Sequence, residues 1–304
     1  YILAQGIAFK DKLNALDKTS ADYNQKLSRI FNDTSKEALK KSEDVLRKVK
    51  DSVYGFEVDS GKADMASGKI WINFAWSGDA VYTLDEAETY GTELYYSVPE
   101  EGSNVWFDGW VMPKGANKAL AQEFLNFLNT PENVIENMNY IGYTSAIAGD
   151  VLFDNTKDWY GLYVLVETSD GDIELNGKTY SEEYFGDLDE ATLNSFKNAD
   201  GTYNLNIPEY NDDDEVISFS EETIEVYPYD VSYFFSNISE ENKTEGKAVI
   251  YTDTIDRQLY TQYPDGETIE RCIIMDYFTK EQNNDLNNMW SSVKIGYMSP
   301  VTMI

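Results

Sequence analysis

The sequence predicts an α/β fold that carries a β-rich insertion. Residues 1–153 alternate between helical patterns and short apolar runs, whereas residues 154–253 hold many tyrosines, many acids and short alternating runs. Alternation of strand and helix is typical of a largely parallel sheet covered by helices. We therefore expect three parts: an α/β lobe at 1–153, a β-rich acidic insertion at 154–253, and a C-terminal helical return to the lobe at 254–304.

The elements of the expected lobe follow from local signals. Residues 1–50 are predicted to be helical, and the clearest helix begins near Thr34 and Ser35, whose hydroxyls can cap it. Three strands should follow at 70–75, 94–98 and 105–111, because these runs are rich in β-branched and aromatic residues.

Two further helices are expected after these strands. Asn117 can cap a helix that runs through Leu128, and Thr130 begins another with Pro131 in its first turn, where a missing N–H does no harm. Ligands of α/β folds lie beyond the carboxyl ends of strands, and the segment 76–79 follows such an end.

Turn signals divide the expected insertion. Asn176 and Gly177 can supply the positive φ angles of a two-residue hairpin turn within 172–180. Asp200–Gly201 and the acidic run 211–215 indicate further turns. The run 212–215 is either a solvated turn or a calcium loop, although it lacks the glycine and the terminal glutamate of an EF-hand.

The composition excludes several function classes. Lys and Arg number 24 against 55 Asp and Glu, a net charge of −31, so we expect no nucleic-acid partner, because a phosphate backbone requires a basic surface. The chain has no histidine, which argues against a catalytic triad and a zinc site, and we expect neither metal nor cofactor. Its single cysteine, Cys272, lies in an apolar run and is expected to be buried and inert.

The apolar runs and the first residues of the chain predict how it relates to a membrane and to a longer protein. A membrane-spanning helix needs about 18 or more apolar residues, and no such run exists in the sequence. The chain opens at Tyr1 within an apolar helical pattern that lacks a preceding cap, so we expect it to be a fragment.

Two aromatic-plus-carboxylate pairs are the candidate binding residues. Trp76 precedes Asp79, and Trp106 precedes Asp108. An indole face attracts an ammonium group by roughly 0.5–2 kcal/mol, and a carboxylate can pair with the buried charge. Two such pairs would hold both ends of a diamine. The alternative is that the tryptophans are core residues and that Asp79 caps a helix.

The segment from about Trp71 to Thr144 resembles the spermidine/putrescine-binding proteins of ABC importers. The resemblance lies in an ordered set of short motifs: Trp76-Ser-Gly-Asp79, Val98-Pro-Glu-Glu-Gly102, Trp106-Phe-Asp108, Met112-Pro-Lys-Gly115, Phe124-Leu-Asn-Phe-Leu128, Thr130-Pro-Glu-Asn133 and Tyr140-Ile-Gly-Tyr-Thr144. A weaker similarity covers 259–270 and 289–294. The resemblance as a whole implies a periplasmic-binding-protein-like lobe. Most of the 154–253 insertion has no counterpart in that family.

The resemblance also implies roles for particular residues. In the family, positions matching Trp76, Asp79, Trp106 and Asp108 line a cleft between two lobes, where the aromatics stack on methylene groups and the acids bind ammonium groups. Tyr143 matches a tyrosine that also contacts ligand, although it could instead be a loop aromatic that covers the core.

The implied protein is not an enzyme but the extracytoplasmic substrate-binding component of a polyamine ABC transporter. Its partners would be putrescine or spermidine and an ABC permease, which some lineages fuse upstream. Membrane association would arise only through that permease or through an anchor before Tyr1.

Two departures and two alternatives accompany this interpretation. About the first half of a full family member has no counterpart before Tyr1, and a glutamine ligand of the family falls near Met275, which cannot form similar hydrogen bonds.

The first alternative is a binding protein of the same fold for another solute, such as an oligosaccharide or a metal complex. The second is a glycoside hydrolase that uses paired carboxylates.

Overall fold

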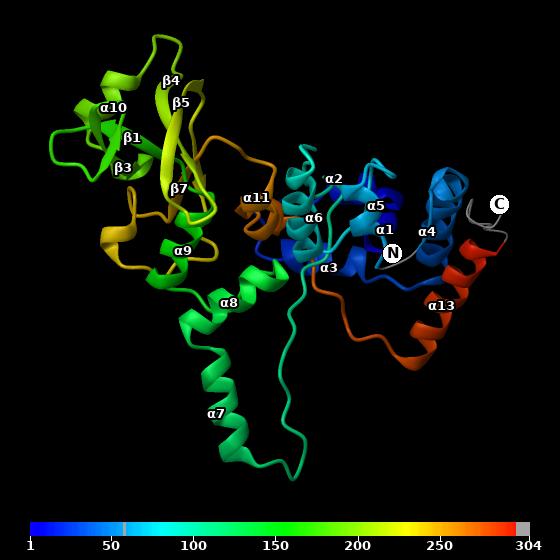
Figure 1. Cartoon of the computed structure of the whole chain (residues 1–304). Coiled ribbons are helices and arrows are strands. Elements are labelled where there is room, and N and C mark those ends of the chain that lie inside the picture. The colour runs from blue at the N-terminus through cyan, green and yellow to red at the C-terminus, as the bar shows by residue number, and fades with distance from the viewer. Residues whose placement is uncertain (57–58, 296–304) are drawn as a thin grey trace. The chain divides into compact units, whose positions relative to one another are not determined.

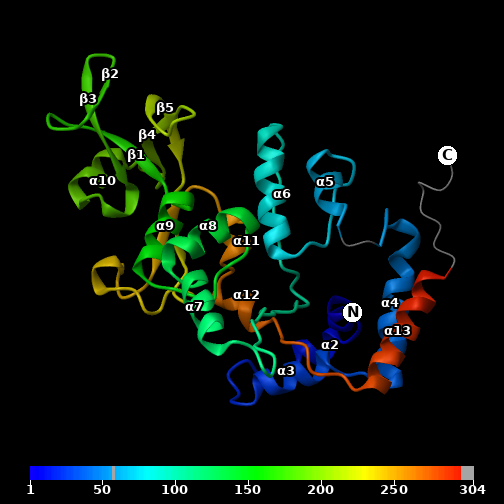
Figure 2. The same cartoon turned by 60° about the horizontal axis from the view of Figure 1, so that its bottom comes forward.

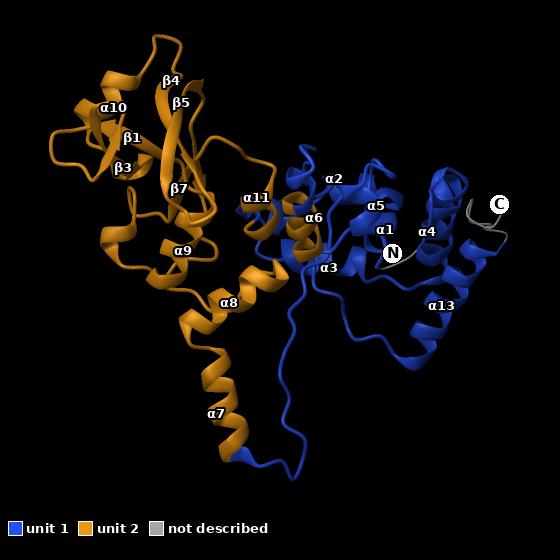
Figure 3. Ribbon diagram, in the orientation of Figure 1, with its two compact units in different colours: residues 1–76, 86–118, 264–304 blue, residues 77–85, 119–263 orange. Residues whose placement is uncertain are grey.

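The computed structural model describes residues 1–56 and 59–295 (Figures 1 and 2). The chain forms two compact units (Figure 3). Unit 1 comprises residues 1–76, 86–118 and 264–304, and unit 2 comprises residues 77–85 and 119–263. The end of the expected C-terminal segment, residues 296–304, lies outside the described residues. The three-part division expected from the sequence stays a prediction.

Unit 1 is built mainly from helices. They are α1 (Ile2–Ala8), α2 (Lys10–Asn14), α3 (Tyr23–Phe31), α4 (Lys36–Val49), the 3-10 turn η1 (Lys50–Ser52), α5 (Gly61–Ala66), α12 (Gly266–Glu270) and α13 (Lys280–Lys294). Part of the core forms where Ile2, Leu27 and Phe31 pack against Ile273, so the first and last segments of the chain share one apolar cluster.

The helix expected after Thr34 is confirmed as α4. Ser35 is its N-cap, and the hydroxyl of Ser35 accepts a hydrogen bond from the Ala38 amide at 3.3 Å. Helix α13 lies beside α4 in both views (Figures 1 and 2). Arg47 Nη2 donates to the Ser292 carbonyl at 2.8 Å across this contact.

The three strands expected at 70–75, 94–98 and 105–111 are wrong. Within the described residues these segments form no strand; an isolated parallel bridge joins Asn104, one residue before the third segment, to Ile273, and the Val105 amide donates to the Ile273 carbonyl at 2.8 Å. Trp71, at the start of the first segment, is 89% exposed. Their apolar pattern fits a buried strand, but a strand also needs neighbours that exchange backbone hydrogen bonds. The described part of the chain supplies such a neighbour only at Ile273.

The remaining helices lie wholly or mostly in unit 2. They are α6 (Ser77–Thr89), α7 (Lys118–Leu128), α8 (Pro131–Ile141), α9 (Asp150–Tyr160), the 3-10 turn η2 (Phe185–Asp187), α10 (Glu190–Phe196), the 3-10 turn η3 (Glu240–Asn242) and α11 (Gln258–Gln262). The helices expected after Asn117 and at Pro131 are confirmed as α7 and α8. None of the helices formed by the described residues has the length and apolar character needed to cross a membrane.

All strands of the described residues lie between 163 and 252. They are β1 (Tyr163–Glu167), β2 (Ile173–Leu175), β3 (Lys178–Tyr184), β4 (Tyr203–Tyr210), β5 (Val216–Ile224), β6 (Tyr227–Asp230) and β7 (Val249–Thr252). They form an antiparallel sheet in the order β1-β3-β2 and two antiparallel pairs, β4-β5 and β6-β7. Helix and strand are both present, which confirms the α/β class, but the named strands pair antiparallel and not parallel.

Local turn chemistry explains the hairpins of this region. Leu175 pairs with Lys178, so Asn176 and Gly177 form a two-residue turn with φ of 53° and 79°, which confirms the expected hairpin. The strands enclose a core of their own around Leu162, Val164, Phe185 and Leu205.

Candidate functional site

Two of the candidate aromatics are brought together in unit 1. Trp76 is the N-cap of α6, and Trp106 follows the bridge between Asn104 and Ile273. Their rings meet edge to face, with centroids 4.9 Å apart and planes at 67°. The two side chains are 47% and 37% exposed, so they are not core tryptophans. An edge-to-face pair occupies the face of only one ring, so indole surface remains that can contact a ligand.

Asp108 is the candidate acid that is close to this pair in the sequence. It follows Trp106 by two residues in a segment without helix or strand and is exposed. That the Asp108 carboxylate lies beside the Trp76–Trp106 pair stays a prediction from the sequence.

Asp79 and Tyr143 belong to unit 2 and lie on contacting segments. Asp79 is in the first turn of α6, and Tyr143 follows the end of α8. The ring of Tyr143 rests on Gly78, because a Cβ built on Gly78 would lie 2.1 Å from Tyr143 Cδ2. Tyr143 therefore lies directly beside the helical turn that carries Asp79.

Gly142 makes this contact possible. It ends α8 in the left-handed conformation, with φ of 71°, and a Cβ at this position would lie 2.7 Å from the Gly78 carbonyl oxygen. A side chain at Gly142 would be unfavourable both for the backbone angle and for the space available. Two glycines from segments about sixty residues apart in sequence thus bring Tyr143 next to α6.

The alternative role of Asp79 as a helix cap is wrong. Helix α6 begins at Ser77, with Trp76 as its N-cap, so Asp79 lies inside the first turn. The negative charge is still favourable there because it faces the positive end of the helix dipole. Its backbone carbonyl accepts a hydrogen bond from Thr83 Oγ1 at 2.7 Å.

The lone cysteine lies outside these segments, in unit 1. Cys272 is partly buried, and its thiol donates to the Thr268 carbonyl at 3.2 Å. Burial raises the pKa of the thiol above its ordinary value, which keeps it in the less reactive protonated form.

The acidic run at 211–215 forms a turn between β4 and β5. Asn211 Oδ1 accepts hydrogen bonds from the Asp213 and Glu215 amides, each at 2.9 Å, and Asp214 adopts a φ of 57°. Among the described residues, no group of three or more histidine, cysteine or acidic side chains is placed to hold a metal ion.

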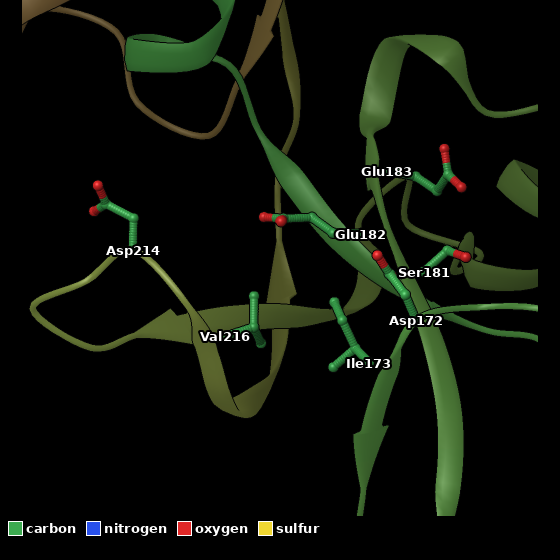
Figure 4. A pocket seen from close by; sticks show the side chains of 7 residues that line it. All are labelled: Asp172, Ile173, Ser181, Glu182, Glu183, Asp214 and Val216. Carbon is green, nitrogen blue, oxygen red and sulfur yellow. The ribbon is translucent and has the colours of Figure 1, made fainter.

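A pocket of about 410 Å³ opens in the insertion. It is lined by Asp172, Ile173, Ser181, Glu182, Glu183, Asp214 and Val216. Figure 4 shows the side chains of Glu182 and Glu183 pointing to opposite sides of β3, so the lining acids do not converge. The hydroxyl of Tyr210 donates to Glu182.

Comparison with known proteins identifies the family. The sequence profile of the bacterial extracellular solute-binding proteins matches residues 6–160, which is about half of the chain and includes all five candidate residues. The chain therefore belongs to the bacterial extracellular solute-binding protein family.

Relatives of known function resemble this chain over shorter stretches. A putrescine/agmatine-binding protein of Pseudomonas aeruginosa is 27% identical over 141 residues, covering 45% of this chain and 38% of the relative. A putrescine-binding periplasmic protein of Escherichia coli is 31% identical over 106 residues, covering 34% and 29%. A spermidine/putrescine-binding periplasmic protein of Salmonella typhimurium is 29% identical over 120 residues, covering 39% and 33%. The resemblance stated from the sequence is thus confirmed, and the chain spans about a third of the length of these relatives.

Sequence reasoning missed the residues that hold Tyr143 in place. Gly78 was part of a recognised motif, but its contact with the Tyr143 ring joins segments that no local pattern connects. The only available signal was the glycine itself, at a helix start where a larger residue has better helix propensity.

Proposed function

We propose that this chain is the substrate-binding component of a polyamine ABC transporter and captures putrescine or spermidine on the extracytoplasmic side of the membrane. The proposed ligand-binding residues are Trp76, Asp79, Trp106, Asp108 and Tyr143. The Trp76–Trp106 pair, half exposed and followed by Asp108, is the observation that carries the proposal. The names of the relatives support the choice of polyamine.

The chemistry of these residues favours a cation over a neutral solute. Indole and phenol rings can stack on sugars as well as on methylene chains, but a neutral sugar gives no reason for a carboxylate beside each aromatic group. A net charge of −31 adds a long-range attraction for di- and trivalent cations. The protein would bind without catalysing a reaction, use no cofactor, and hand the ligand to an ABC permease. Association with the membrane would depend on that permease or on an anchor.

Calorimetry of the full chain tests the ligand class. We expect heat of binding with putrescine or spermidine, and none with 1,4-butanediol, which has the length of putrescine but no ammonium groups. Binding of an oligosaccharide in place of the amines would favour another solute. Turnover of a chromogenic glycoside would replace the proposal with the hydrolase alternative.

Replacing Asp108 with asparagine should weaken polyamine binding much more than it changes folding. Removing one partner of a desolvated ion pair costs on the order of 2–5 kcal/mol, which corresponds to a Kd at least about 30-fold higher. Asp213→Asn is the matched control, because it removes the same charge from a turn of the insertion. Equal affinities of the two variants would show that Asp108 acts only through the overall charge.

Replacing Trp76 with leucine should keep an apolar side chain but remove the indole face. We expect a loss of roughly 0.5–2 kcal/mol in binding, together with the edge-to-face contact to Trp106. Trp71→Leu is the control, because Trp71 is 89% exposed and lies outside the pair. If Trp76→Leu binds polyamine as tightly as Trp71→Leu does, the indole pair has no part in capture.

A further inference from the structure

Gln262, the last residue of α11, is a buried amide in unit 2 that contacts both neighbours of Tyr143. Its side chain is 2% exposed. Gln262 Nε2 donates to the Gly142 carbonyl at 3.3 Å, and the Gln262 backbone carbonyl accepts a hydrogen bond from the Thr144 hydroxyl. One residue therefore holds the chain immediately before and immediately after Tyr143, although it lies 118 residues beyond Thr144.

The orientation of this amide is fixed from its other side. Tyr160, at the end of α9, donates its hydroxyl to Gln262 Oε1 at 3.2 Å. Burial, with smaller contributions from Tyr263 and Asp85, raises the pKa of Tyr160, so the hydroxyl keeps its proton and acts as a donor. The Gly142 carbonyl can only accept, so the two contacts together require Oε1 to face Tyr160 and Nε2 to face Gly142.

Tyr263, the residue after Gln262, contacts residues of the insertion. The Tyr263 carbonyl accepts a hydrogen bond from the Tyr229 hydroxyl of β6 at 2.8 Å, and the Tyr263 ring packs against Phe234 and Phe235. Tyr263 is 2% exposed, and burial raises the pKa of its hydroxyl to about 12, so it is uncharged at neutral pH. The position of Gln262 is therefore set by the core of unit 2 and not by solvent.

We infer that Gln262 is a positioning residue for the ligand-binding loop 142–144, and that Tyr160 acts on the same loop by orienting the Gln262 amide. Three residues hold this loop in position, each through a different contact. Gly78 offers the surface on which the Tyr143 ring rests, Gln262 fixes the chain on both sides of that ring, and Tyr160 prevents the amide from rotating. The effect on ligand affinity rests on the proposed polyamine function, whereas the effect on the loop does not.

Methionine at position 262 gives the most direct test. It has nearly the shape of glutamine but cannot donate to Gly142 or accept from Tyr160. In hydrogen–deuterium exchange of the unliganded full chain, we expect peptides spanning 138–146 to exchange about tenfold faster in Gln262→Met, relative to peptides from β1. Tyr160→Phe should give a smaller increase in the same peptides, because it removes only the orienting hydroxyl.

Gln5→Met is the matched control. Gln5 is also completely buried, and its Nε2 donates to the Ile30 and Asp33 carbonyls, the latter at 2.9 Å, but it belongs to unit 1. The same substitution there should lower stability without a selective change at 138–146. Equal exchange of these peptides in wild type and Gln262→Met, or an equal increase in Gln5→Met, would overturn the inference.

Spermidine affinity separates this inference from the proposed function. If both are correct, Gln262→Met raises the Kd for spermidine about tenfold, and the effect disappears in a Tyr143→Ala background, because the loop then has no ring to position. If wild type binds neither spermidine nor putrescine, the function is wrong, but a selective increase in exchange at 138–146 would still establish the positioning role. If wild type binds and Gln262→Met lowers affinity equally with and without the Tyr143 ring, Gln262 does not act through that ring.

Discussion

The contact between Gly78 and Tyr143 predicts a specific steric effect of Gly78→Ala. A Cβ at position 78 would lie 2.1, 2.3 and 2.5 Å from Cδ2, Cε2 and Cγ of the Tyr143 ring. Ordinary contacts of carbon atoms begin near about 3.5 Å, so the ring would have to move by more than an ångström. Overpacking of this kind costs about 1–3 kcal/mol. Alanine within a helix recovers up to about 1 kcal/mol, so we expect a net loss of about 0–2 kcal/mol, which is about 1–3 kcal/mol relative to an alanine that meets no ring.

Gly266→Ala is the control for the helix effect. Gly266 lies in the first turn of α12, as Gly78 lies in the first turn of α6, and a Cβ there meets no atom within 4 Å. This variant should be as stable as wild type or slightly more stable. Urea unfolding, followed by circular dichroism, compares the three proteins through their midpoints and slopes.

A double mutant shows whether the Tyr143 ring is the cause. Tyr143→Ala removes the ring, so Gly78→Ala should be harmless or stabilising in that background, and the two changes should be coupled by about 1–3 kcal/mol. The reasoning fails if Gly78→Ala unfolds at the same urea concentration as Gly266→Ala, or if its cost is unchanged without the ring. Either result would mean that Tyr143 does not rest on Gly78.

Two further predictions concern caps and acid stability. Ser35→Ala removes the hydroxyl that accepts a hydrogen bond from the Ala38 amide, so it should lower the free energy of unfolding by about 0.5–2 kcal/mol. Urea titration measures this change, and substitution of an exposed serine outside the cap is the control. Asp150 accepts hydrogen bonds from the Ser239 amide at 2.7 Å and from Asn242 at 2.9 Å, and these donors hold the pKa of its carboxyl below 3.8. The charged form therefore stabilises the fold above that pH and loses this effect as pH falls through the folded-state pKa, so the stability difference between wild type and Asp150→Asn should shrink on acidification. A difference that is constant from pH 7 to pH 3 would contradict this account.

The elements that the sequence predicts well are those that depend on neighbouring residues. The Ser35 cap, Pro131 in the first turn of α8, and the Asn176–Gly177 turn each require only a few residues with suitable side chains or backbone angles. In each case the chemistry that signals the element is also the chemistry that stabilises it.

The strand predictions failed because a strand is not a local structure. The runs at 70–75 and 105–111 have suitable side chains, but residue preferences for strands reflect packing against neighbours and not the backbone alone. Within the described residues, none of the three runs joins a strand ladder, and the isolated bridge to Ile273 is made by Asn104, one residue before the third run. The sequence pattern records the side chains that suit a sheet, but not the location of the partner strands.

The candidate site divides in the same way. Sequence motifs predict five candidate ligand-binding residues: Trp76, Asp79, Trp106, Asp108 and Tyr143. No sequence pattern predicts that Gly78 supports the Tyr143 ring. The two hydrogen bonds between Gln262 and the same loop join segments more than a hundred residues apart, and the weak similarity at 259–270 does not reveal them. Residues that touch a ligand can leave a recognisable pattern, whereas residues that hold them in place act through contacts that only the folded chain creates.

Each unit, considered alone, combines aromatic surface with a carboxylate. Unit 1 offers the Trp76–Trp106 pair with Asp108, and unit 2 offers Tyr143 beside the turn of Asp79. An acid that enters a binding site loses hydration, which is costly unless a positive group replaces the water. Burial of either acid against a ligand therefore requires a positive group on that ligand. An ammonium group supplies that charge, and the methylene groups next to it offer an apolar surface to the aromatic rings, which is the chemical reason for proposing a polyamine.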